Sequence, residues 1–129
     1  MVLTPHPGEA ARLLGVSIAD LERDRFCAVR ELARRYDAVA VLKGAGSLIA
    51  NPGGQVAVCP WGNPGMASGG MGDVLTGVIA GLLAQGLDAW DAACLGVGLH
   101  ARAGDLVARA GERGLLASAL FPYLRALVN

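Results

Sequence analysis

The apolar positions of this chain repeat with two different periods, and the change of period separates expected helices from expected strands. Apolar residues that recur about every 3.6 positions lie on one side of a helix and therefore predict helices. Short unbroken apolar runs predict strands. The expected helices span residues 7–14, 18–36, 74–85, 88–110 and 118–128. The expected strands span residues 2–4, 38–42, 47–50 and 55–59. Short strands ahead of helices indicate an α/β fold.

Residues that start or stop helices support these bounds. Pro7 suits a first helical turn, Gly15 a helix end, and Ser17 and Ser118 the N-cap position. The helix at 74–85 has one apolar side and a second side of small residues, which predicts close packing against a neighbour. These small residues are Gly77, Ala80 and Gly81.

The expected sheet is small for so much apolar helix. The run Ala38 to Leu42 predicts a strand buried on both faces of a parallel sheet, and Asn51 to Gly54 predicts the turn of a hairpin. The sequence predicts about three complete strands and about five helices, and its first strand starts abruptly. We therefore expect residues 1–129 to be the C-terminal portion of a larger α/β domain, with a truncated, mostly parallel sheet.

Composition narrows the function classes. The 129 residues carry 11 basic and 11 acidic side chains without a basic run, which argues against nucleic-acid binding. Mean hydropathy is +0.46, but the longest apolar candidate, Val74 to Leu87, is too short to span a membrane. No signal peptide is expected from residues 1–129, because no basic segment followed by an apolar run stands at their start. Three dispersed cysteines, Cys27, Cys59 and Cys94, indicate reduced, buried thiols in a cytoplasmic protein. The apolar excess suggests a surface covered by another subunit or a missing segment.

The segment Gly62 to Asp73 is the most informative part of the chain, and we call it the glycine segment. Its glycines allow close backbone approach to a ligand, and the following helix adds free amides and a positive dipole end. The amides of Gly69, Gly70 and Gly72 are expected to cradle phosphate. Asp73 beside them is interpreted as a general base on a substrate hydroxyl, although an acid favoured by the helix dipole is the alternative.

A second glycine-containing loop follows the most buried expected strand. Lys43, Gly44, Ala45, Gly46 and Ser47, here called the lysine loop, lie at the carboxyl end of that strand. Ligands of open α/β sheets bind outside the carboxyl ends of strands. The lysine is expected to pair with phosphate while a nucleotide lies on the glycine backbone, and a plain turn is the alternative.

Other polar residues are less decisive. His6 between two prolines is either a substrate contact or a local helix cap, and Glu9 is expected to be a helix N-terminal acid. His100 is expected to be a hydrogen-bonded core histidine. Asp105 is expected to form a surface charge cluster with Arg102 and Arg109. Asn63 is expected to close a turn. Trp61 and Trp90 are expected to pack in the core. No cluster has the spacing of a structural metal site, so any metal is expected to be Mg²⁺ carried by the nucleotide.

Three motifs in order resemble one known family. They are Thr4-Pro5-His6-Pro7-Gly8-Glu9, Lys43-Gly44-Ala45-Gly46-Ser47 and the segment from Gly62 to Gly77. Together they look like the C-terminal part of an ADP- or ATP-dependent NAD(P)H-hydrate dehydratase of the ribokinase-like superfamily. The resemblance covers essentially the whole chain and implies a three-layer α/β/α fold.

The resemblance also implies a reaction, its residues and its partners. The family uses a nucleotide to phosphorylate the hydroxyl of hydrated NADH or NADPH and then expels phosphate to restore the cofactor. It implies that Asp73 removes the hydroxyl proton, that His6 contacts the hydrated cofactor, and that Gly72 and residues 43–47 hold ADP or ATP. It implies a homo-oligomer or association with the N-terminal half of the domain.

Departures from the family pattern keep alternatives open. Ser47 stands where the family usually has Thr, and Ala119 where it usually has Asp. The expected absence of the N-terminal half means that the chain alone could be inactive. The first alternative is a ribokinase-like small-molecule kinase for a vitamin precursor or carbohydrate, which uses the same glycine segment. The second is a nucleotide-binding fragment without catalysis.

Overall fold

The computed structural model describes all 129 residues as a small sheet between helices. In chain order the elements are β1 (Val2–Leu3), α1 (Pro7–Leu14), α2 (Ile18–Arg23), α3 (Arg25–Tyr36), β2 (Val39–Leu42), β3 (Leu48–Ala50), β4 (Val56–Val58), the 3-10 helix η1 (Pro64–Met66), α4 (Met71–Ala84), α5 (Ala89–Ala108), the 3-10 helix η2 (Ala117–Leu120) and α6 (Phe121–Val128). The strands lie side by side in the order β1-β2-β3-β4.

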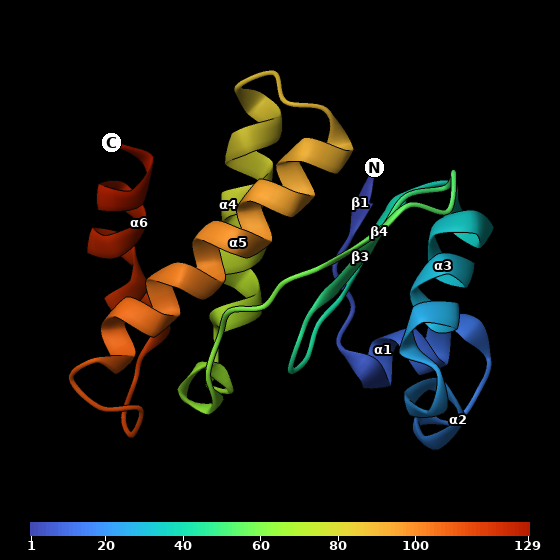
Figure 1. Ribbon diagram of the computed structural model, residues 1–129, viewed down its shortest axis with the longest axis horizontal. Coiled ribbons are helices and arrows are strands. Elements are labelled where there is room, and N and C mark those ends of the chain that lie inside the picture. The colour runs from blue at the N-terminus through green and yellow to red at the C-terminus, as the bar shows by residue number, and fades with distance from the viewer.

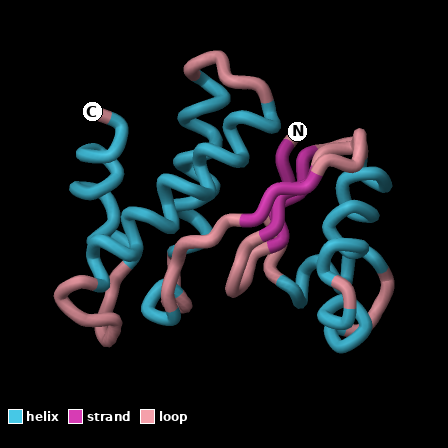
Figure 2. Tube along the Cα trace, viewed as in Figure 1, coloured by secondary structure: helices cyan, strands magenta, loops and turns pink.

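The sheet is covered by helices on both faces, which confirms three layers (Figures 1 and 2). Successive strand residues point to opposite faces. Ala40 and Leu42 of β2 therefore pack with α1, α2 and α3, whereas Val39 and Val41 pack with α4 and α5. Leu115 and Leu120 form a third cluster with Met71 and α5, which attaches α6 beyond α5.

The expectation of a mostly parallel sheet is wrong for this chain. Only β1 and β2 are parallel, and β2–β3 and β3–β4 are both antiparallel. Loop length explains the difference, because strands joined by a few residues can only pair antiparallel. The predicted hairpin is confirmed, with Leu48 opposite Val58 and Ala50 opposite Val56.

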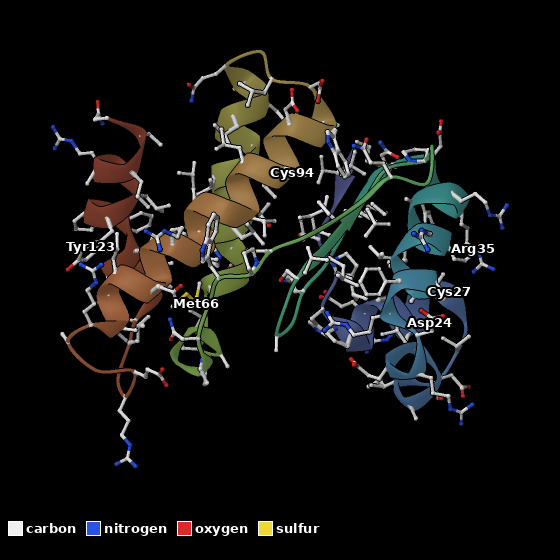
Figure 3. All side chains as sticks on the ribbon, in the orientation of Figure 1. Asp24, Cys27, Arg35, Met66, Cys94 and Tyr123 are labelled. Atoms are coloured by element: carbon white, nitrogen blue, oxygen red, sulfur yellow. The ribbon has the colours of Figure 1, made fainter.

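The expected helix over 18–36 is two helices. Its pattern breaks at Asp24, which ends α2 and then caps α3 by accepting a hydrogen bond from the Cys27 amide at 2.9 Å (Figure 3). An Asp side chain competes well for such an amide, so it favours a new helix start over continuation. The predicted caps at Gly15 and Ser17 are confirmed: Gly15 is left-handed, and the Ser17 hydroxyl accepts from the Asp20 amide.

The C-terminal helix differs from expectation as well. Ser118 does not cap it but lies inside η2, and α6 begins at Phe121 without a side-chain cap. With the division at Asp24, six α-helices replace the five expected. None of the helices has both the length and the apolar composition needed to cross a membrane.

The small-residue side of α4 is exposed, contrary to the expected close packing. Gly77 and Gly81 have no neighbour where a Cβ would stand. The close contact between α4 and α5 instead occurs at Gly96 of α5, where a Cβ would meet the Ile79 side chain at 2.7 Å. Packing of these two helices across Gly96 places the first turn of α4 beside the middle of α5.

Candidate functional site

A cavity of about 810 Å³ lies at the carboxyl ends of the two parallel strands. Its walls come from the turn before α1, the lysine loop, the segment after β4, the first turn of α4 and the middle of α5. His6 and all five residues of the lysine loop belong to this wall, together with Gly72. The structure therefore brings together most of the site residues predicted from the sequence.

The parallel strands place the lysine loop beside the histidine turn. The Lys43 amide donates to the Pro5 carbonyl at 3.0 Å, which continues the pairing of β1 with β2 past the strand ends. Gly44 and Gly46 have positive φ, and their amides donate no hydrogen bond. The Ser47 hydroxyl donates to the Gly44 carbonyl at 3.3 Å. The amides of Gly44 and Gly46 are thus among the free amides of the lysine loop.

The end of the glycine segment carries a larger set of free amides. The amides of Gly69, Gly70, Gly72 and Asp73 make no hydrogen bond, and Gly70 is the N-cap of the 14-residue helix α4 without a side-chain cap. A Cβ at Gly72 would stand 2.9 Å from the Lys43 Nζ, so the ammonium lies against this backbone. Unpaired amides, the positive end of a helix dipole and an ammonium are the groups that attract anions in proteins.

Asp73 lies at the edge of this arrangement. It is the third residue of α4 and is exposed, and neither it nor Gly69 or Gly70 belongs to the cavity wall. Residues turn by roughly 100° each along a helix. With Met71, Gly72 and Leu75 facing the cavity, Asp73 therefore points to the other side of the helix start. The carboxylate is next to the free amides and faces away from the cavity.

His6 has the local role that the sequence left open, and it lines the cavity too. Its Nδ1 accepts from the Glu9 amide at 3.2 Å, while the Glu9 carboxylate accepts from the His6 amide at 2.9 Å. Glu9 is therefore a first-turn acid, as expected. The hydrogen bond from the His6 backbone, and secondarily the His6 and Lys43 charges, lower the pKa of Glu9. Because Nδ1 is an acceptor, Nε2 carries the proton of the neutral ring.

His100 is buried as predicted but is not hydrogen-bonded in the way expected. It is 9% exposed, its Nε2 has no hydrogen-bond partner, and it lines the cavity. Burial lowers the pKa of His100, the backbone of Met71 opposes this shift, and the Lys43 charge adds to it. His100 is thus a buried polar group in the cavity wall near Lys43. The only sequence signal for the burial of His100 was its position on α5, opposite the stripe of polar residues.

Asp105 holds the glycine segment and does not form the expected surface charge cluster. Its carboxylate accepts from the Gly62 amide at 3.2 Å and from the Asn63 Nδ2 at 2.8 Å. The expected turn closure by Asn63 is confirmed, because its Oδ1 accepts from the Gly65 amide at 3.0 Å. Asp105 lies more than 40 residues away, so spacing along one helix could not reveal this contact.

Two side chains of the cavity wall were not predicted. Trp61 is 46% exposed at the cavity, not packed in the core, and the Arg102 guanidinium lies 5.4 Å from its ring centroid. Met66 of η1 lies against α5 (Figure 3), where a Cβ at Gly104 would meet its sulfur. Trp90 packs against the core cluster, as expected. No three His, Cys, Asp or Glu side chains gather as metal ligands.

The layers and the cavity at the strand ends define a ribokinase-like α/β protein. The fold is similar to that of a ribokinase-like superfamily protein from Enterococcus faecalis, with a TM-score of 0.80 and 32% identity, covering 97% of this chain and 44% of that one. A family model described as NAD(P)H-hydrate dehydratase, of the carbohydrate-kinase type, matches residues 1–125. The chain belongs to this NAD(P)H-hydrate dehydratase family.

Similar proteins include enzymes of cofactor repair. The bifunctional NAD(P)H-hydrate repair enzyme Nnr of Vibrio cholerae is 60% identical over 99% of this chain and 26% of its own length. The ADP-dependent (S)-NAD(P)H-hydrate dehydratase of Neisseria meningitidis is 45% identical over 100% of this chain and 44% of its own length. The Bacillus subtilis ADP/ATP-dependent NAD(P)H-hydrate dehydratase, co-crystallized with ATP and Mg²⁺, has a TM-score of 0.93 and 38% identity, covering 98% of this chain and 46% of that one. The chain thus spans between a quarter and a half of these relatives.

Proposed function

We propose that this chain binds an adenine nucleotide in the cavity and serves the nucleotide-dependent dehydration of hydrated NADH or NADPH. The observation that carries the proposal is the Lys43 ammonium against Gly72, beside four unpaired amides at the start of α4. Such a site attracts phosphate oxygens. The relative from Neisseria meningitidis is named as ADP-dependent, and the one from Bacillus subtilis was co-crystallized with ATP and Mg²⁺.

In this proposal the two sides of the helix start have different roles. The lysine loop, Gly69, Gly70 and Gly72 hold the nucleotide, and Mg²⁺ arrives with its phosphates, because no cluster of metal ligands stands in the chain. Asp73 points to the other side, where the hydrated cofactor would lie. The terminal phosphoryl group would then sit between them, within reach of both the amides and the substrate hydroxyl.

The chemistry proceeds in two steps. Asp73 accepts the hydroxyl proton as the hydroxyl oxygen attacks the terminal phosphorus, and the bond to the nucleotide's bridging oxygen breaks. The amides and Lys43 stabilise the charge that develops on the phosphoryl oxygens. In the second step the C–O bond of the phosphate ester breaks, phosphate leaves, and loss of a ring proton restores the dihydronicotinamide. His6 lines the cavity, with its Nε2 3.5 Å from the Glu9 carboxylate, and contacts the hydrated cofactor where that ligand reaches past the helix start into the cavity.

The proposal includes the setting of the chain. Residues 1–129 form the C-terminal portion of a ribokinase-like domain and associate with the rest of that domain or with a second copy. Exposed apolar residues on α4 and α5, such as Leu83 and Leu95, and the open small-residue side of α4 support such an association. Three free cysteines suit the reducing cytoplasm, although Cys27 is exposed and not buried as expected. Sedimentation of the chain alone, and mixed with the rest of the domain, tests the association.

Two measurements on the chain test the function. Calorimetry with ADP, with and without Mg²⁺, is expected to show binding. Recovery of NADH absorbance from hydrated NADH with ADP is expected once the complete domain is present. A stable phosphorylated alcohol in place of recovered NADH would indicate a small-molecule kinase. Nucleotide binding without turnover in the complete domain would indicate a binding fragment, and no nucleotide binding by either form would refute the proposal.

A further inference from the structure

Arg25 holds the lysine loop from the side opposite the cavity. It is the first residue of α3, immediately after the break at Asp24, and its side chain is only 19% exposed. The guanidinium donates to three carbonyls: Nη1 to Ala45 at 3.0 Å, and Nη2 to Lys43 at 3.2 Å and to Leu42 at 3.4 Å. All five residues of the lysine loop line the cavity, and Arg25 does not.

The geometry of the peptide bond converts these contacts into an orientation of the amides. In a trans peptide the carbonyl and the following amide point in opposite directions, and the chain has no cis peptide. When the Lys43 and Ala45 carbonyls point at Arg25, the next amides, those of Gly44 and Gly46, point away from it. Neither amide donates a hydrogen bond within the chain, and both stay free on the side away from Arg25. Arg25 therefore binds the acceptor side of the loop and leaves the donor side free.

Space and charge agree with this arrangement. Gly44 has φ +149°, and a Cβ there would meet the Arg25 Nη2 at 2.8 Å, so the loop and the guanidinium fit only with glycine. Acids compensate the charge of Arg25 only weakly: its Nε makes no hydrogen bond, and the Glu22 carboxylate lies 4.0 Å from that nitrogen. A partly buried positive charge therefore stands behind the loop and favours an anion in front of it.

From this geometry we infer that Arg25 is a positioning residue that fixes the lysine loop with the Gly44 and Gly46 amides free for an anionic ligand. The inference rests on the proposed nucleotide function, since it assigns the acceptor of those amides to the phosphate of ADP or ATP. Arg25 itself does not touch the ligand. Lysine is not equivalent to it, because a flexible ammonium lacks the rigid planar fork with which the guanidinium binds three carbonyls.

The inference is tested on the chain itself with Arg25→Met and Arg25→Lys. We expect the Kd for ADP to rise by about tenfold or more in Arg25→Met, and by less in Arg25→Lys, since misplaced binding groups cost up to about a hundredfold. NMR order parameters of residues 43–47 are expected to fall from about 0.85 towards 0.6 without a change in the rest of β2. Arg23→Met is the matched control, because Arg23 is exposed and pairs only with Asp20.

The outcomes separate this inference from the proposed function. No ADP binding by the parent chain would refute the nucleotide assignment and, with it, the acceptor that we assign to the two amides. Parental ADP affinity and loop order in both Arg25 variants would overturn the inference alone. Arg25→Lys decides if Arg25→Met fails to fold. Weaker binding with equal loss in Arg23→Met would also overturn it, because the effect would then follow from net charge.

Discussion

The two loops that line the cavity are held in opposite ways. A cation, Arg25, binds the lysine loop through its carbonyls. An anion, Asp105, binds the beginning of the glycine segment through an amide N–H and the Asn63 side chain. The difference decides which groups remain free. Binding the carbonyls leaves amides free within the same loop, whereas in the glycine segment, where the Gly62 amide is bound, most free amides lie at the far end, from Ser68 onward.

The comparison teaches that both anchors work from outside the site. Arg25 lies on α3 and Asp105 on α5, on opposite sides of the sheet, and neither lines the cavity. Each loop is therefore shaped by a residue that leaves the ligand space empty. The free amides on the two loops are equivalent in kind, and the following predictions separate their roles.

The largest effect is expected at the end of the glycine segment. In the complete domain, Asp73→Asn should lower turnover by about 10² or more, because the variant cannot accept the hydroxyl proton. Its ADP affinity should stay within about twofold, since the amides still bind phosphate. Recovery of NADH absorbance and calorimetry measure the two quantities. Asp91→Asn, at the same third position of α5, is the control, and parental turnover in Asp73→Asn would contradict the assigned role.

The next effect concerns the anchor of the glycine segment. Asp105→Ala removes the acceptor for Gly62 and Asn63, so the free energy of unfolding should fall by about 2 kcal/mol, as for hydrogen bonds to a charged group. Urea denaturation measures this change. Asp20→Ala breaks only an exposed pair with Arg23 and should cost less than about 1 kcal/mol. Equal losses in the two variants would show that Asp105 is not an anchor.

A smaller effect is expected where the two loops touch. Gly72→Ala places a methyl group where the Lys43 ammonium now lies, so the ammonium must move away from the amides. We expect ADP affinity to fall about tenfold, equivalent to about 1.4 kcal/mol, without loss of thermal stability. Gly77→Ala has open space and should stabilise α4 by up to about 1 kcal/mol with unchanged affinity. Unchanged affinity in Gly72→Ala would separate Lys43 from the anion site.

The smallest effect is expected from His100 in the cavity wall, through the pH dependence of the free energy of unfolding. The pKa of His100 is lowered in the folded chain, whereas an unperturbed histidine has a pKa of about 6.5. Below about pH 6.5 the unfolded chain therefore binds a proton at His100 more readily than the folded chain does. The contribution of this group to stability is therefore fully present above about pH 6.5 and is lost as pH falls towards the folded pKa, by at most about 1.4 kcal/mol per pH unit. Unfolding measured between pH 7.5 and 5 tests this, and an unchanged slope in His100→Gln would contradict it.

Local signals were sufficient for much of the fold. Pro7 and Gly15 correctly predicted the bounds of α1, and the turn at Asn51 to Gly54 correctly predicted the hairpin. Each of these signals acts within a few residues. The break at Asp24 was missed because the apolar pattern continues through it, although an Asp before a new helical turn is an N-cap signal.

The motifs that form the candidate site could be predicted from the sequence, but the contacts that hold them in place could not. His6, the lysine loop and Gly72 meet at the cavity because the parallel strands β1 and β2 end at the same edge. The contacts of Arg25 and Asp105 join residues 17 to 43 positions apart, and no period or cap marks such a pair in the sequence. The roles of His6, Asp73 and the residues of both loops stay predictions for the experiments above.

The hydrogen bond from the Lys43 amide to the Pro5 carbonyl has a consequence for how this protein tolerates insertions and deletions. It makes the spacing of the imidazole and the ammonium a property of sheet register, since each residue advances a strand by about 3.3 Å. One residue added to β1 or β2 would slide one group past the other by that amount and turn the following side chains to the opposite face. The lengths of these two short strands should therefore vary far less among relatives than the turn at 51–54 beyond them.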